Sequence, residues 1–125
     1  MHITTETTGG AVIAHVAGRL DFHAANVFQK DLETLVAQCV SEGCGLVLNC
    51  LKLDYVSSAG LRSFLLGARA AEAAKVGFVV CNLSAQVQEV FDVSGFSRLM
   101  ATTHSQATAI ELILLGQHGQ RLHRD

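Results

Sequence analysis

The sequence lacks the features that mark membrane proteins and nucleic-acid-binding proteins. No apolar run approaches the roughly 20 residues that a membrane-spanning helix needs. The threonine-rich start of the chain also lacks the apolar core of a signal peptide. The nine lysine and arginine residues are scattered and the net charge is −2, so there is no basic surface for nucleic acid. We therefore expect a cytoplasmic protein that binds no nucleic acid and does not insert into a membrane.

Patterns for catalysis, metal ligation and cofactor binding are missing as well. The four cysteines form no Cys-x-x-Cys pair, and the six histidines include no close pair at ligand spacing on a predicted helix. No serine lies in a Gly-x-Ser-x-Gly elbow, and the glycines form no nucleotide-binding fingerprint. We predict a protein that is not an enzyme, with no cofactor, no metal site, no catalytic residue, and thiols that are reduced and mostly buried.

A length of 125 residues is enough for one domain with a single hydrophobic core. No proline, internal repeat or low-complexity tract divides the chain. Hydrophobic residues make up 50% of the sequence and charged residues 16%, which favours a packed domain over a disordered chain. We expect one domain over residues 1–115, followed by a flexible C-terminal tail over residues 116–125.

The spacing of apolar residues alternates between strand and helix patterns. A β-hairpin is predicted around the Gly9-Gly10 turn. Strands are expected at residues 2–7, 11–17, 45–50, 78–81 and 99–102. Helices are expected at about 24–40, from Leu61 to a C-terminal cap at Gly77, from a cap at Ser84 to Gly95, and from a cap at Ser105 to about Leu115. This order predicts an α/β fold, in which about four α-helices pack against a mixed sheet of four to five strands opened by the hairpin.

Apolar stripes on the first three predicted helices indicate which side chains face the core. The stripe on the first helix comprises Ala25, Phe28, Leu32, Leu35, Val36 and Cys39. The stripes on the second and third helices comprise Leu61, Phe64, Leu65 and Ala68, and Val87, Val90 and Phe91.

The stretch from Asp54 to Arg62 joins a buried strand to an amphipathic helix through a predicted loop. Its two serines, Ser57 and Ser58, lie where a hydroxyl can accept a hydrogen bond from a free N–H group of the helix's first turn. A helix cap with no further role is the simplest interpretation of these serines, and Gly60 then only allows the helix to approach the sheet closely. The same helix end favours negative charge, so a phosphate group there would be stabilised.

Three motifs in the chain resemble the motifs of a known family. They are Gly18-Arg19-Leu20-Asp21, Leu46-Val47-Leu48-Asn49, and the loop Ser57-Ser58-Ala59-Gly60-Leu61. Over nearly its full length the chain resembles the STAS domain, a family named for sulphate transporters and anti-sigma factor antagonists. In the bacterial single-domain antagonists of this family, a partner kinase phosphorylates a serine in the loop. Aligned on Gly60-Leu61, that serine is Ser58.

The resemblance implies a regulatory binding module whose partner is an anti-sigma factor that is also a serine protein kinase. The unphosphorylated protein would bind this partner and release a sigma factor, and phosphorylation of Ser58 would end the binding. A phosphoserine phosphatase is a further implied partner. The implied binding surface comprises Asp21, Asn49, Ser57, Ser58, Ala59, Gly60, Leu61 and Arg62. Asp21 has a second interpretation, as a cap of the first helix.

Two positions depart from the family pattern. Where this chain has Ser57 and Asn49, members of the family commonly have acidic residues. Their replacement removes negative charge beside the presumed acceptor and could alter recognition by a kinase. Three other functions stay open: a stressosome-type scaffold subunit, a soluble partner of a lipid-transport ABC ATPase complex, and, in a different class, a small hydrolase with Ser58 as its nucleophile. The edge strand of the hairpin could also pair with a second copy and form a homodimer.

Overall fold

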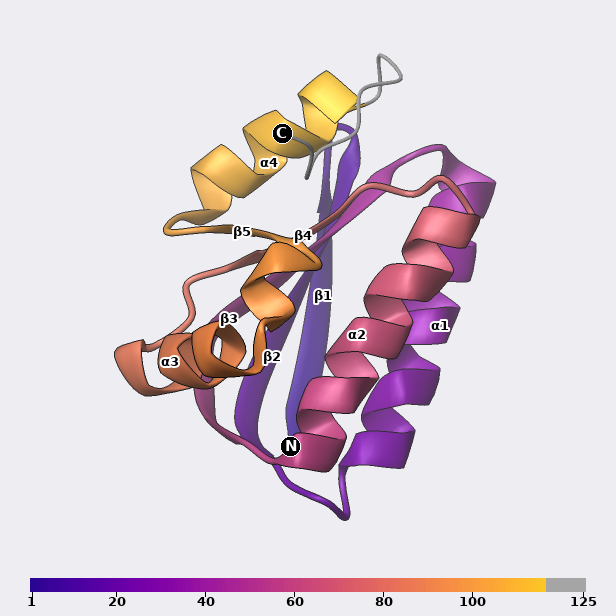
Figure 1. Cartoon of the computed structure of the whole chain (residues 1–125). Coiled ribbons are helices and arrows are strands. Elements are labelled where there is room, and N and C mark those ends of the chain that lie inside the picture. Colours follow the sequence, from indigo (N-terminus) through magenta and orange to yellow (C-terminus); the bar gives the residue numbers. More distant parts are fainter. Residues whose placement is uncertain (117–125) are drawn as a thin grey trace.

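The computed structural model describes residues 1–116, which form a five-stranded sheet with helices on both faces (Figure 1). The strands are β1 (His2–Thr8), β2 (Ala11–Leu20), β3 (Gly45–Val56), β4 (Phe78–Cys81) and β5 (Ala101–Thr103). The helices are α1 (Ala25–Glu42), α2 (Ser58–Ala73), α3 (Ala85–Ser94), the short 3-10 helix η1 (Phe96–Arg98) and α4 (Gln106–Gly116). The strands lie in sequence order; β1 is antiparallel to β2, and the other pairs are parallel. The predicted mixed sheet, its opening hairpin and its four α-helices are confirmed.

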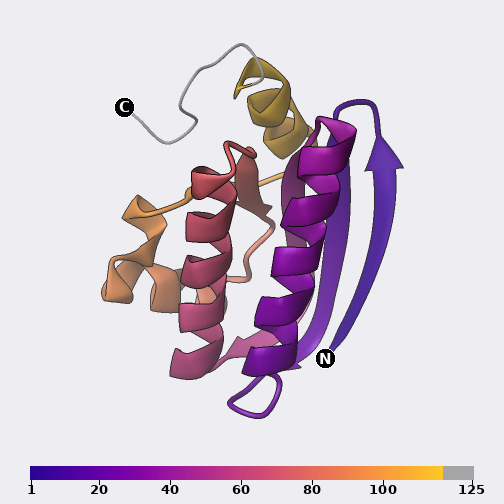
Figure 2. The ribbon, with the colours of Figure 1, turned by 90° about the vertical axis from the view of Figure 1, so that its right-hand side faces the viewer.

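The helices divide unequally between the two faces of the sheet. Helices α1, α2 and α3 pack on one face and enclose the larger core, and Figure 2 shows α1 and α2 side by side. Helix α4 packs on the other face, where its buried residues Ala109 and Ile113 contact side chains from β2, β3 and β4. Among the helices of residues 1–116, none is both long enough and apolar enough to cross a membrane.

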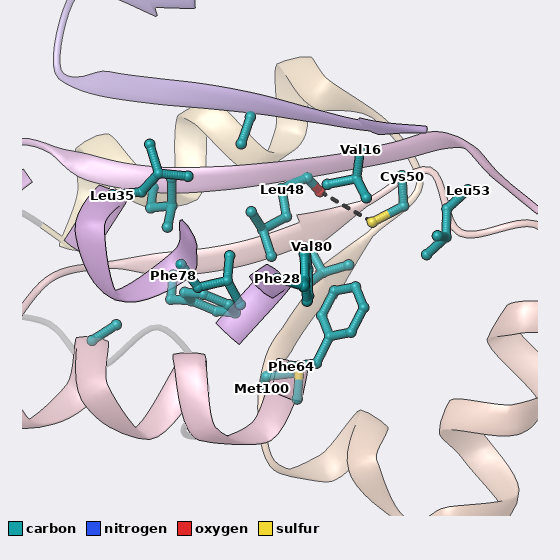
Figure 3. Close-up of a cluster of buried hydrophobic side chains, with 14 of the residues drawn as sticks. Val16, Phe28, Leu35, Leu48, Cys50, Leu53, Phe64, Phe78, Val80 and Met100 are labelled. Carbon is teal, nitrogen blue, oxygen red and sulfur yellow. Dashed lines mark hydrogen bonds between the residues drawn. The ribbon is translucent and has the colours of Figure 1, made fainter. Parts of the chain in front are cut away.

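Three phenylalanines connect the helices of the larger core, and Figure 3 shows two of them, Phe28 and Phe64. The rings of Phe28, Phe64 and Phe91 come from α1, α2 and α3, and their centroids are separated by 5.0 Å and 5.3 Å along the series. Each ring buries a large apolar area, so the series fixes how the three helices sit relative to one another. The predicted apolar stripe of α1 is confirmed, because all six of its residues are buried.

Strand β3 is longer than predicted. Residues 51–56 lie beyond the predicted strand and include the start of the predicted loop at Asp54. They continue the strand past the last residue paired with β4 and pair only with β2. Two register shifts between β2 and β3 insert extra residues into this part of β3 and disturb the alternation of side chains. The apolar pattern therefore breaks at the exposed Leu51 and Lys52, although Leu53 and Val56 are buried.

The predicted helix caps are partly confirmed. Ser84 Oγ accepts a hydrogen bond from the Val87 amide at 3.2 Å, and Gly95 ends α3 in the left-handed conformation with φ of 83°. Ser105 Oγ accepts from the Thr108 amide at 3.1 Å, as expected at the start of α4.

The cap predicted at Gly77 is wrong, because the chain leaves α2 earlier. Helix α2 ends at Ala73, and Lys75 takes the left-handed conformation with φ of 60°. The Val76 amide then donates to the Ala71 carbonyl at 2.8 Å, which completes a Schellman-type ending before Gly77 is reached.

Several further boundaries and one core residue differ from the prediction: β2 continues to Leu20 and α2 already begins at Ser58. Val90 is 39% exposed, because the ten-residue helix α3 turns its Val87 and Phe91 side toward the sheet. Strand β5 covers residues 101–103 instead of 99–102, and Gly116 ends α4 instead of opening a tail. The remainder of the predicted tail, residues 117–125, lies outside the described residues.

Candidate functional site

The carboxyl ends of the parallel strands β2 and β3 lie side by side and lead into α1 and α2. The Ser57 amide donates a hydrogen bond to the Leu20 carbonyl oxygen at 2.9 Å, which ties the start of α2 to the end of β2. Residues 21–24, which follow β2, are therefore adjacent to residues 57–62. We call these two segments together the junction.

The two serines of the junction have different roles. Ser57 is the N-cap of α2, and its Oγ accepts a hydrogen bond from the Gly60 amide at 3.0 Å. Ser58 is the first helical residue and its side chain is exposed. Within residues 1–116 the Ser58 hydroxyl has no hydrogen-bond partner. The capping role that either serine could have taken belongs to Ser57, which leaves the hydroxyl of Ser58 exposed to solvent.

Gly60 sets the distance between α2 and β2. A Cβ atom at this position would lie 2.6 Å from Leu20 Cγ and 2.7 Å from the Leu20 carbonyl oxygen, closer than real side chains approach. The same carbonyl accepts the hydrogen bond from Ser57, so it cannot move away without loosening the junction. The expected role of Gly60, a close approach of helix and sheet, is confirmed.

Ser63 was not predicted as part of the site, yet it ties the first turns of α1 and α2 together. Its side chain is 3% exposed, and its hydroxyl donates toward the Ala25 carbonyl at 2.9 Å and the Ala59 carbonyl at 3.1 Å. The sequence signal was a row of small residues along one side of α2. This row comprises Gly60, Ser63, Gly67 and Ala71, all of which are buried.

Asp21 stabilises the loop between β2 and α1 and does not cap the helix. Its Oδ1 accepts a hydrogen bond from the Ala24 amide at 3.0 Å, whereas α1 begins at Ala25 without a side-chain cap. Phe22, at the next position, is 74% exposed, and its ring meets the edge of the His23 ring at a centroid distance of 5.7 Å. Phe22 was not predicted as part of the site, and it is a large, exposed apolar side chain on the loop that follows β2.

Asn49 lies away from the junction. It is 7% exposed, and its amide nitrogen donates to Gln106 Oε1 of α4 at 2.8 Å. Its Oδ1 accepts from the Leu51 amide at 3.0 Å and from Asn82 Nδ2 at 3.2 Å. Asn49 precedes the end of β3 by seven residues, a distance of about 20 Å along an extended strand. A neutral amide here avoids burying a charge, so this departure does not change the charge beside Ser58.

The other predicted site residues divide into buried supports and an exposed surface. Leu61 is buried in the core, Gly60 is buried against Leu20, and Ala59 is half-buried. Arg62 is exposed, and among the described residues it has no ion-pair partner. Because Arg62 follows Ser58 by four residues on one helix, the two side chains lie on the same side of α2.

The cysteines take no part in the junction. All four are free, and three of them are buried. Burial raises the pKa of Cys39 to about 12 and that of Cys81 to about 11, so neither thiol ionises at neutral pH. The prediction of mostly buried thiols is confirmed. In the part of the chain that the structure describes, no group of three or more His, Cys, Asp and Glu side chains gathers as a metal site would require.

The sequence model of the STAS domain matches residues 2–118, nearly the whole chain. The chain therefore belongs to the STAS domain family. Its curated relative from Bordetella bronchiseptica (strain RB50), named "Putative anti-sigma factor antagonist BtrV", is 36% identical over 109 residues. This similarity covers 87% of the present chain and 91% of the relative.

Solved structures of anti-sigma factor antagonists share the fold. The unphosphorylated form of the antagonist SpoIIAA superposes with a TM-score of 0.65 at 20% identity, over 92% of this chain and 99% of that one. The phosphorylated form of the Bacillus cell fate determinant SpoIIAA gives a TM-score of 0.60 at 23% identity, over 88% and 97% of the two chains. At these identities the comparison establishes the fold and not the activity.

Proposed function

We propose that this protein is a regulatory binding module of the anti-sigma factor antagonist type, which acts in the cytoplasm without catalysing a reaction. In this proposal, its partner is an anti-sigma factor that is also a serine protein kinase. The unphosphorylated junction binds this partner, phosphorylation of Ser58 ends the binding, and a phosphoserine phosphatase restores it. The observation that carries the proposal is the exposed Ser58 hydroxyl at the start of α2, free because Ser57 provides the cap.

The exposed side chains of the junction are the proposed contact surface. Ser58 and Arg62 project from the first turns of α2, and Phe22 projects from the adjacent loop. Aromatic and arginine side chains supply much of the binding energy in protein interfaces, because they combine large contact areas with directed hydrogen bonds. Gly60, Leu61 and Ser63 belong to the supporting layer, which holds these side chains in place. Asn49 is left out of this surface because α4 covers it.

Phosphorylation is proposed to act across the interface and to leave the fold intact. A phosphate adds about −1.5 to −2 charges at neutral pH. The first turn of α2 contains no acidic residue, and Arg62 lies one turn further on, so the charges of α2 itself favour the phosphate. A partner pressed against Ser58 would have to desolvate the phosphate, at a cost of several kcal/mol unless it supplied matching cations. Each 1.4 kcal/mol weakens binding about tenfold.

The proposal is tested by affinity purification from the native cells with four baits: wild type, Ser58→Ala, Ser58→Asp and Ser84→Asp. Ser84→Asp is the charge control, because it replaces the serine cap of α3 with an equally good cap and adds one negative charge outside the junction. We expect wild type, Ser58→Ala and Ser84→Asp to recover an ATPase of the histidine-kinase-like type, and Ser58→Asp to lose it. The recovered kinase should then phosphorylate wild type, and not Ser58→Ala, on intact-mass measurement.

Other outcomes would assign a different function. Recovery of one transporter ATPase, or only of further copies of the chain, by all four baits would contradict the switch. Covalent labelling of Ser58 by a fluorophosphonate would contradict the assignment as a binding module, because such labelling requires an activated serine nucleophile.

A further inference from the structure

Strand β1 is a long, open edge of the sheet. It has seven residues, and within residues 1–116 it pairs only with β2. Proteins usually protect such an edge with proline, lysine, a bulge or a covering segment. The sequence of β1, His-Ile-Thr-Thr-Glu-Thr-Thr, has neither proline nor lysine, and its register with β2 is free of bulges. Four of its residues are threonines, which favour extended backbone.

The register of the hairpin shows which backbone groups face outward. Thr8 pairs with Ala11 across the two-residue Gly9-Gly10 turn, so these two residues exchange both backbone hydrogen bonds. The even-numbered residues of β1 therefore bond to β2. The odd-numbered residues Ile3, Thr5 and Thr7 direct their N–H and C=O groups toward the open edge.

We propose that β1 pairs with β1 of a second copy of this chain, antiparallel and about a two-fold axis at Thr4, to form a dimer with a continuous ten-stranded sheet. In this register Ile3 and the partner's Thr5 exchange two backbone hydrogen bonds, and symmetry makes four in total. Met1 falls opposite the partner's Thr7, so the ladder can extend at both ends. The proposal is independent of the phosphorylation switch.

A side-chain hydrogen bond between His2 and Glu6 selects the second copy and this register. With Thr4 on the axis, His2 lies directly opposite the partner's Glu6, and the symmetric pair forms as well. These are non-hydrogen-bonded positions, where cross-strand side chains are closest. His15 Nε2 already lies 2.7 Å from Glu6 Oε2, which leaves the other carboxylate oxygen for the partner's His2.

Neighbouring registers fit less well. An axis at Thr5 would place His2 opposite the partner's Thr8 and Glu6 opposite the partner's Thr4, so His2 would not meet Glu6. An axis at Glu6 would bring the two carboxylates together, which is unfavourable.

The dimer would leave helix α2, which bears Ser58 and Arg62, accessible. Helix α2 packs on β3 and β4, whereas β1 lies at the sheet edge beyond β2. Because one strand from each chain makes a small interface, we expect a weak dimer, with a dissociation constant on the order of micromolar to hundreds of micromolar.

Sedimentation equilibrium over a range on the order of 10 to 500 μM tests the association of wild type, Thr5→Pro and Thr5→Ala. Proline at position 5 removes an outward N–H group and none of the bonds to β2, so it should abolish the dimer while circular dichroism stays native. Thr5→Ala keeps the N–H group and should still dimerise. A monomeric wild type at the highest concentration, or a dimer that survives Thr5→Pro, would overturn the proposal.

Disulfide trapping tests the register. With Thr4 on the axis, Thr4→Cys should yield a covalent dimer when copper-phenanthroline and dioxygen oxidise the two thiols, because non-hydrogen-bonded pairs bring Cβ atoms within disulfide reach. Thr5→Cys, which would meet itself only with the axis at Thr5, should cross-link no faster than wild type, whose native cysteines provide the background. Preferential cross-linking of Thr5→Cys would refute the Thr4 register.

Discussion

Helices α2 and α3 begin at the same kind of cap and differ in what lies behind it. Ser57 and Ser84 each accept a hydrogen bond from the amide three residues further on, at 3.0 Å and 3.2 Å. The residue that donates this bond is Gly60 in α2, which has no room for a Cβ atom, and Val87 in α3, which inserts into the core. Helix α2 is therefore pressed against β2, whereas the start of α3 is separated from the core beneath it by a side chain.

The two starts also differ in what lies beside the cap. The first helical residue is Ser58 in α2 and Ala85 in α3, and both are exposed. Four residues further along, on the same side of each helix, lie Arg62 in α2 and Glu89 in α3. The cap itself is therefore generic. A rigid support and a cationic neighbour distinguish the start of α2 from the start of α3, and both features suit the phosphorylation that we propose at Ser58.

The largest expected effect on stability comes from adding a methyl group where α2 contacts β2, behind the Ser57 cap. Gly60→Ala should destabilise the protein by roughly 3 kcal/mol, because the new methyl group meets the backbone oxygen of Leu20. Urea denaturation measures the change in the free energy of unfolding. Gly9→Ala is the control, because nothing lies within 4 Å of its added Cβ atom. Equal stability of the Gly60→Ala and Gly9→Ala variants would show that α2 is not pressed against β2.

A smaller loss is expected from the hydrogen bonds that join α2 to α1. Ser63→Ala removes a buried hydroxyl that bonds to the Ala25 and Ala59 carbonyls, and should cost about 1–2 kcal/mol. The equivalent position of α3, six residues after its cap, is the partly exposed Val90, where Val90→Ala should cost less than about 0.5 kcal/mol. Thermal unfolding of the two variants compares them directly. If Val90→Ala proved the more harmful, the support behind α2 would not be special.

The caps themselves should be nearly equivalent. Ser57→Ala and Ser84→Ala each remove one side-chain hydrogen bond to a helix amide, and each should cost about 1 kcal/mol. Ser57→Asp should recover most of the loss at α2, since aspartate is an equally good cap. Denaturation of the three variants tests this. A loss at Ser57 that aspartate fails to recover would mean that Ser57 does more than cap.

Features that depend on the residues of a single strand or helix were predictable from the sequence. Strand β4 was predicted at residues 78–81, because a short continuous apolar run between polar neighbours suits a strand covered on both sides. The buried face of α1 was predicted residue by residue, because helical periodicity is local information.

The remainder depends on contacts between distant segments. Local pattern could not show that β3 continues past β4, because its last residues pair with β2 alone. Nor could it place Asn49 beneath α4, since its partner Gln106 is 57 residues away. The sequence also left open which serine is the cap. That choice follows from where β3 ends, which the register with β2 determines.

The smallest expected effect tests the charge that distinguishes the two helix starts. Ser58→Asp should leave stability unchanged or raise it by up to about 1 kcal/mol, because the carboxylate meets the positive helix end and Arg62. Ala85→Asp gains the same helix-end interaction at α3 but faces Glu89, so its gain should be smaller by about 0.5 kcal/mol. Thermal unfolding at low and high salt measures both variants, and the difference should shrink at high salt because all these groups are exposed.

The Arg62→Gln variant tests whether Arg62 causes the difference in stability between Ser58→Asp and Ala85→Asp. In the Arg62→Gln background, the gain in stability from Ser58→Asp should fall to that of Ala85→Asp or slightly above it, since only the helix-end interaction remains. Ser58→Asp would then retain a stable fold while carrying the charge that is proposed to end partner binding, which separates the switch from any effect on folding. A marked loss of stability in Ser58→Asp would contradict this separation, because the added charge would then act on the domain itself and not across its interface.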